Sequence, residues 1–115
     1  MPEKKITGVR LPEEMFQAIE DMYFAYRVAS RSECARLLLE QGFQDLLNSP
    51  NSPLPQIEVS GATSKDMSVQ LSEELFEKLE KFRCTRRITS RAQAIRIVLT
   101  YALQKYQQGQ LALKR

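Results

Sequence analysis

Two short runs along the 115-residue chain alternate between apolar and polar residues. The first is "KITGVRL", which ends at Leu11, and the second is "DMSVQL", which ends at Leu71. Alternation with a period of two predicts a half-exposed β-strand in each run. The motifs "PEE" and "SEE" follow directly, and their Pro12, Ser72 and paired glutamates favour the start of a helix. Each run therefore predicts a strand that leads into a helix.

Two amphipathic helices are predicted after each strand. From Met15 to Tyr26, and again from Leu75 to Phe82, apolar residues recur at a helical period and form a single stripe. After a break, a second helix is predicted to begin at Ser30 in one segment and at Ser90 in the other, because Ser-x-x-Glu and Ser-x-x-Gln are capping boxes. This second helix is the more apolar one, and we expect it to be the more buried.

The two segments are copies of each other. At an offset of sixty positions the sequence aligns with itself from Val9 to Gln44 without a gap, and Phe16 falls on Phe76 and Glu20 on Glu80. "SRSECARLLLEQG" likewise falls on "SRAQAIRIVLTYA". The register is kept for too long to be chance, and it indicates a duplication. We divide the chain into a first unit at residues 1–47, a linker rich in Pro and Ser at 48–65, a second unit at 66–108 and a tail at 109–115.

A single copy cannot fold alone, because its strand leaves backbone groups unpaired and roughly 40 residues bury too little apolar surface. Two copies remove both difficulties if their strands pair antiparallel over a core of four helices. We therefore predict a mainly α fold with a short β ribbon. Pairing within one chain, as a pseudo-dimer, is favoured by the high effective concentration of the two copies. A homodimer with two ribbons is the alternative, since the linker allows both arrangements.

Composition excludes several classes of function. The chain has no histidine, and its two cysteines, Cys34 and Cys84, lie in unrelated contexts, so a zinc site and histidine-based catalysis are not expected. No nucleophile–base pair or glycine-rich phosphate loop is visible, so we expect neither an enzyme nor a bound metal or cofactor. No apolar run approaches the ~18 residues that cross a bilayer, and "MPEKKITGVR" lacks the apolar segment of a secretory signal. We expect no membrane partner and a cytoplasmic location.

Charge is unevenly distributed between the copies. Residues 1–47 carry six Lys and Arg against eight Asp and Glu, whereas residues 66–115 carry ten against five. Such an asymmetry favours an acidic partner for the second half, and nucleic acid is the commonest one.

Each copy has a short strand, the motif Leu-Pro/Ser-Glu-Glu, an amphipathic helix, and then "SRSE" or "SRAQ" with a second arginine five positions after the first. This order resembles the ribbon-helix-helix superfamily of DNA-binding proteins. Both copies have nineteen residues from the leucine that ends the strand to the capping serine, and the resemblance covers about 80 of the 115 residues. It implies a tandem ribbon-helix-helix protein that binds double-stranded DNA sequence-specifically. The implied role is a transcriptional repressor or a plasmid or phage accessory factor, associated with the nucleoid.

The resemblance also implies roles for individual residues. The antiparallel ribbon would lie in the DNA major groove and contact base edges through its outward side chains, and these are Ile6, Gly8, Arg10, Asp66, Ser68 and Gln70. Arg10 is suited to guanine O6 and N7, and Gln70 to adenine N6 and N7. The N-termini of the second helices would hold phosphates, and the residues expected to contact phosphate are Ser30, Arg31, Ser32, Ser90, Arg91, Lys5, Lys65 and Arg87.

Simpler roles compete for several of these residues. Ser30 and Ser90 are equally well explained as helix caps, and Arg10 alone could be a solvated strand charge. Arg36 and Arg96 could form structural ion pairs or cover the core.

Some positions depart from the family pattern. Arg27 and Arg87 stand where such proteins usually have glycine, and a left-handed backbone is costly for arginine. Gly8 offers no side chain for hydrogen bonding, and Asp66 would repel phosphate. These features, with the acidic first copy, leave a second function open, a protein-interaction module such as a toxin-neutralising antitoxin.

Overall fold

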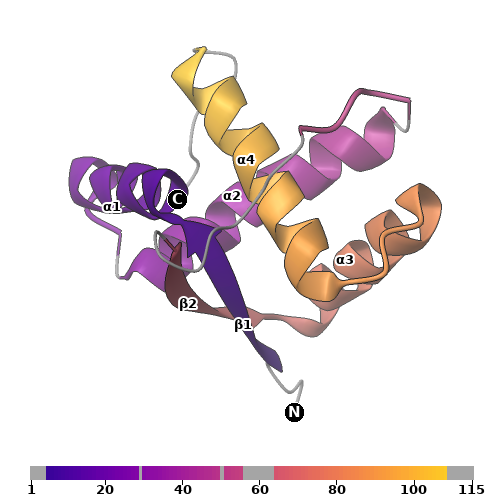
Figure 1. Cartoon of the computed structure of the whole chain (residues 1–115), viewed down its shortest axis with the longest axis horizontal. Helices are drawn as coiled ribbons and strands as arrows, with labels where there is room; N and C mark the ends of the chain where they lie inside the picture. The colour runs from indigo at the N-terminus through magenta and orange to yellow at the C-terminus, as the bar shows by residue number, and fades with distance from the viewer. Residues whose placement is uncertain (1–4, 29, 50, 56–63, 109–115) are drawn as a thin grey trace.

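The computed structural model of the chain describes residues 5–28, 30–49, 51–55 and 64–108, without the side chains of residues 5–7 and 64. Its elements, in chain order, are β1 (Lys5–Pro12), α1 (Glu13–Tyr26), α2 (Arg31–Asn48), β2 (Ser64–Leu71), α3 (Glu73–Arg86) and α4 (Arg91–Gln107). In Figure 1 the two strands lie in the lower part of the molecule, with α1 and α3 on opposite sides and α2 and α4 crossing between them. The tail predicted at 109–115 and residues 56–63 of the linker lie outside the described residues.

β1 and β2 form a two-stranded antiparallel ribbon. Gly8 faces Ser68, Arg10 faces Asp66, and the backbone of residue 6 faces Gln70. Ser68 comes sixty positions after Gly8, so the central pair joins two equivalent positions of the repeat. The ribbon therefore has a pseudo-twofold axis at this pair, which relates its two ends.

The predicted tandem ribbon-helix-helix arrangement over a four-helix core is wrong. The described residues contain one ribbon, and each half of the chain contributes one strand to it. The buried core is not formed by helices alone, because it includes the inward strand side chains Val9, Leu11, Met67, Val69 and Leu71. The mainly helical composition and the antiparallel pairing of one strand from each copy do agree with the prediction, because a single strand cannot satisfy its own backbone donors and acceptors. Neither half is complete without the other, so the chain is one mainly helical unit with one two-stranded antiparallel sheet.

Serine side chains begin three of the four helices. Ser30 Oγ accepts a hydrogen bond from Glu33 N at 3.0 Å, and Ser90 Oγ accepts one from Gln93 N at 3.1 Å. Ser72 Oγ does the same for α3, at 3.1 Å from Leu75 N. These bonds confirm the predicted caps, because each satisfies a backbone amide that has no partner within the helix.

Arginine ends α1 and α3 in a left-handed backbone conformation. Arg27 has φ 52° and ψ 41°, and Arg87 has φ 57° and ψ 45°. Glycine is the residue that usually occupies this region at a helix C-terminus, because a Cβ costs roughly 1–2 kcal/mol there. Both turns keep the glycine-type backbone despite the arginine, and both halves carry the same strain.

Contacts between α2, α3 and α4 join the two halves. At the crossing of α2 and α4, Gly42 lies so close to Val98 that an added Cβ would be 2.6 Å from Val98 Cγ1. The rings of Phe43 and Phe82 pack with their centroids 5.8 Å apart. Among the described residues, no helix has the length and the apolar composition that crossing a membrane requires.

Candidate nucleic-acid interface

The outward face of the ribbon is polar and exposed. Gly8, Arg10, Asp66, Ser68 and Gln70 are all exposed, as the strand alternation predicts. Arg10 Nε donates to Asp66 Oδ1 at 3.2 Å across the ribbon, and the two side chains are 54% and 78% exposed. Asp66 therefore forms an ion pair with the neighbouring strand, and its expected repulsion of phosphate stays a prediction.

The side chains of Lys5 and Ile6, expected to contact phosphate and a base edge, lie outside the described residues. Lys65 is exposed on β2, where it faces Leu11 of β1. Of the two lysines expected near the ends of the ribbon, the structure thus places Lys65 in solvent.

The cap and first turn of α2, residues 30–36, are called here the α2 entrance. Together with Gln70 and Ser72, they surround a hollow of about 290 Å³ that is lined by Ser30, Ser32, Glu33 and Arg36. Gln70 of the ribbon and the N-terminus of α2 thus lie beside each other. Gln70, expected to contact base edges, and Ser30 and Ser32, expected to contact phosphate, therefore line the same hollow.

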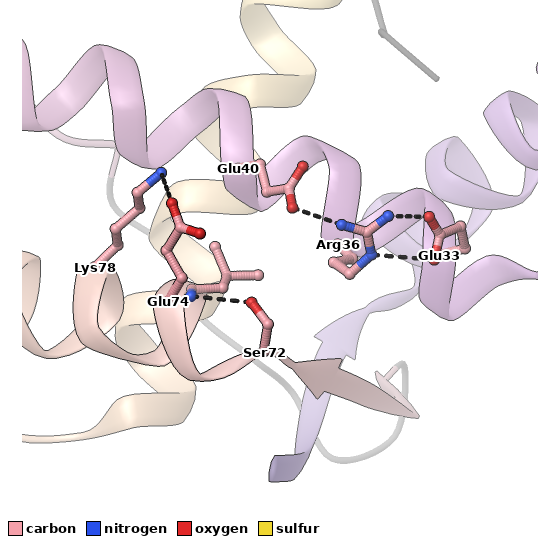
Figure 2. Close-up of polar contacts among 7 residues, drawn as sticks. Glu33, Arg36, Glu40, Ser72, Glu74 and Lys78 are labelled. Carbon is pink, nitrogen blue, oxygen red and sulfur yellow. Dashed lines mark hydrogen bonds and ion pairs between the residues drawn. The ribbon is translucent and has the colours of Figure 1, made fainter. Parts of the chain in front are cut away.

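Arg36 lies between two carboxylates in the α2 entrance, as Figure 2 shows. Its Nε donates to Glu33 Oε2 at 3.0 Å and its Nη1 to Glu40 Oε1 at 2.5 Å. The hydrogen bonds to Glu33 are the largest cause of a raised Arg36 pKa, which the charge of Glu40 raises further. Of the two alternatives for Arg36, the structural ion pair is the one observed.

The α4 entrance, residues 90–96, has the same kind of serine cap but different partners for its arginine. Gln93 and Thr100 stand where the first copy has glutamates. Arg96 Nε donates to Gln93 Oε1 at 3.0 Å, and its Nη1 donates to the backbone oxygen of Arg10 at 3.0 Å. Burial lowers the pKa of Arg96, in contrast to Arg36. Arg96 therefore keeps its positive charge beside β1, whereas at the α2 entrance the carboxylates of Glu33 and Glu40 compensate the charge of Arg36.

Arg31 and Arg91, expected to contact phosphate, form ion pairs with the preceding helix. Arg31 Nη2 lies 2.5 Å from Glu20 Oε1, and Arg91 Nη2 lies 2.6 Å from Glu80 Oε1. Both arginine side chains are about half exposed, at 45% and 53%. Each guanidinium fastens its helix to the one before it and still presents one side to solvent.

Aromatic rings complete the same arrangement in both halves. The guanidinium carbon of Arg31 is 5.8 Å from the ring centre of Phe16, and that of Arg91 is 5.1 Å from the ring centre of Phe76. Such contacts are typical of cation–π interactions. The sequence alone did not reveal these phenylalanines, or the two glutamates, as partners of the arginines. Their recurrence at the sixty-residue offset was the signal that could have found them.

Additional arginines surround the turn between α3 and α4. Glu80 also accepts from Arg83 Nε at 2.7 Å, and this bond is the largest cause of the lowered pKa of Glu80. Arg83 Nη1 donates to the backbone oxygen of Thr89 at 3.0 Å. Arg87 is exposed at the end of α3. The corresponding turn of the first half has Tyr23 in place of Arg83 and is less cationic.

In the described part of the chain, no group of three or more His, Cys, Asp and Glu side chains is arranged to hold a metal ion. The chain was also compared with protein-family models, curated proteins and solved structures, and none of the three comparisons gives a significant match.

Proposed function

We propose that this chain binds double-stranded DNA sequence-specifically, as a transcriptional repressor or a plasmid or phage accessory factor. The ribbon would lie in the major groove, and the α2 and α4 entrances would hold phosphates on either side of it. The observation that carries the proposal is the ribbon itself, which presents five exposed positions outward and buries the alternate side chains. The resemblance to ribbon-helix-helix proteins supports the same function.

The dimensions and chemistry of the ribbon support this proposal. A B-DNA major groove admits a two-stranded β-ribbon, and every base pair presents a distinct pattern of donors and acceptors there. Arg10, Ser68 and Gln70 offer hydrogen-bonding groups of the kind that base edges accept. Gly8, at the centre of the ribbon, has no side chain and allows close approach of the backbone to the groove.

Both helix entrances support phosphate contacts. The first amides of a helix lack partners within it, and together with the positive end of the helix dipole they bind anions. Ser30 and Ser90 cap these helices, and the α4 entrance adds Arg96 without a carboxylate at either matching position. Contacts of this kind orient a protein on the duplex.

A titration with a labelled random-sequence duplex tests the proposal. We expect binding at low salt that weakens steeply as the salt concentration rises, because phosphate contacts release counterions. Ser68→Glu places a negative charge at the centre of the ribbon and should weaken binding by about tenfold or more. Gln104→Glu introduces the same charge near the C-terminal end of α4, which Figure 1 places far from the ribbon, and should have little effect. Absence of binding at low salt, or equal effects of the two variants, would contradict DNA binding through the ribbon.

Interaction with a protein, as in an antitoxin, is the second candidate function. It is favoured by α1, which carries Glu13, Glu14, Glu20 and Asp21 and no basic residue. This function predicts a specific protein partner whose binding is unchanged by Arg10→Ala, together with no affinity for duplex DNA.

A further inference from the structure

The two ends of the ribbon's outward face differ chemically. Under the pseudo-twofold axis at Gly8 and Ser68, Arg10 and Gln70 occupy equivalent positions. Identical strands would present the same side chains at both ends. Here one end presents Arg10 with Asp66, and the other presents Gln70.

Asp66 holds Arg10 in a geometry that suits one base pair. The bond uses Nε of Arg10, at 3.2 Å from the carboxylate, so both terminal nitrogens of the guanidinium can donate outward. Guanine offers O6 and N7 as acceptors to such a fork, and the carboxylate of Asp66 can accept from N4 of cytosine. An A·T pair would place thymine O4, an acceptor, near the carboxylate and would be disfavoured.

Gln70 presents a different combination at the other end. Its exposed side chain borders the hollow that Ser30 and Ser32 also line. A terminal amide has a donor group beside an acceptor oxygen, and this combination matches N7 and N6 of adenine. The phosphate contacts next to this end would come from the α2 entrance.

We propose that the ribbon recognises a non-palindromic site, with a G·C pair at Arg10 and Asp66 and an A·T pair at Gln70. The chain would then bind its site in one orientation, with the α4 entrance on the guanine side, because Arg96 donates to the backbone of Arg10. Asp66 acts as a positioning residue for Arg10. Four residues separate the two ends along a strand, roughly 13 Å or about four base-pair steps. This inference rests on the proposed DNA binding.

Selection from a randomised pool of duplexes tests the orientation. We expect the wild-type chain to select a G·C and an A·T preference about four base pairs apart, in a fixed order. The double variant Arg10→Gln/Asp66→Ile gives both ends of the ribbon the same residues, because residue 6, which faces Gln70, is isoleucine. It should select a palindromic site with A·T at both ends.

A second variant tests Asp66 itself, with a control for the general effect of losing one negative charge. Asp66→Asn should reduce the preference for G·C over A·T at that position by about tenfold, because Arg10 loses its anchor and the repulsion of thymine disappears. Glu77→Gln removes the same charge from the exposed face of α3 and should leave the base preference unchanged. Base preference is the informative readout, since loss of a merely structural contact would weaken binding to all sequences alike.

The outcomes distinguish this inference from the function on which it rests. A palindromic site selected by the wild-type chain overturns the oriented site, and a G·C preference that survives Asp66→Asn overturns the positioning role of Asp66; both outcomes leave DNA binding intact. Binding to no duplex at any salt concentration overturns both. The expected pair of selected sites supports both.

Discussion

At the α2 entrance, Arg36 lies between the carboxylates of Glu33 and Glu40, whereas at the α4 entrance Arg96 bonds to an amide oxygen and a backbone carbonyl. Both helices keep a serine cap, at 3.0 and 3.1 Å. Replacing two glutamates by Gln93 and Thr100 therefore changes the electrostatics of a helix N-terminus that keeps its cap. The two copies therefore share the serine cap of the second helix but differ in the charge around its first turns.

The largest expected effect tests whether the halves share one core. Phe82→Ala removes a fully buried ring that packs on Phe43 of the other half. The free energy of unfolding should fall by about 3–5 kcal/mol. Met22→Ala, at the equivalent position of the first half, should cost about 2–5 kcal/mol. Circular dichroism during urea unfolding should show a single transition in each variant, with Phe82→Leu as a milder version. Two separate transitions would mean that the halves fold independently.

Exchanging the charges of the two entrances tests the comparison directly. Gln93→Glu/Thr100→Glu gives α4 the residues of α2, and duplex affinity at low salt should fall by about tenfold. Glu33→Gln/Glu40→Thr is the reverse exchange and should strengthen binding by a similar factor. Fluorescence anisotropy measures both, with Gln104→Glu/Gln107→Glu at the far end of α4 as the control for charge. If that control weakens binding as much as the exchange at the α4 entrance, the entrances have no special part in binding.

The first half carries a buried thiol that the second half lacks, because Cys34 in α2 has Ala94 as its counterpart, and this thiol should make the stability of the whole chain depend on pH. Burial raises the pKa of the Cys34 thiol from 9.0 to about 11. The unfolded chain ionises first, so the stabilisation is complete below pH 9 and is lost as pH rises towards 11, by about 1 kcal/mol at pH 10. Cys34→Ala should remove this loss between pH 8 and pH 10, as measured by urea unfolding. Cys84→Ala, at an exposed thiol, should leave it in place, and equal losses in wild type and Cys34→Ala would show that the thiol is not responsible.

The smallest effect concerns the left-handed turns, which the halves share. Arg27→Gly and Arg87→Gly should each raise the free energy of unfolding by about 0.5–1 kcal/mol, because the strain of a Cβ at positive φ exceeds the added flexibility of the unfolded chain. Arg27→Lys and Arg87→Lys keep the Cβ and should give no gain. Thermal unfolding of the four variants measures this, and a gain in only one half would show that the two turns differ in strain.

Features that depend on neighbouring residues could be predicted from the sequence. The caps at Ser30 and Ser90 involve residues three positions apart, and the strand alternation is local as well. The exposed face of the ribbon, with Arg10 and Gln70, followed from the same alternation. These predictions succeeded because the periods of strands and helices decide which side chains share a face.

Other features depend on how distant segments meet. The pairing of Arg10 with Asp66 requires the register of two strands that are 56 residues apart, and sequence alone suggested only that the aspartate would repel DNA. Arg31 and Glu20 meet because a left-handed turn brings α2 back to α1. The pairing of one strand from each copy was predicted from the sequence, whereas the division into tandem units over a four-helix core was wrong because the inward strand side chains belong to one shared core. The shared ribbon is decided by backbone pairing between the copies.

Both strands of the ribbon belong to one chain, so the ribbon closes in a unimolecular step. A ribbon assembled from two identical chains separates on dilution, and well below the dissociation constant its abundance falls with the square of the chain concentration. Here the number of complete ribbons is proportional to the number of chains at every dilution. Even a cell that holds only a few copies of this chain has intact ribbons, and each can carry different residues on its two strands.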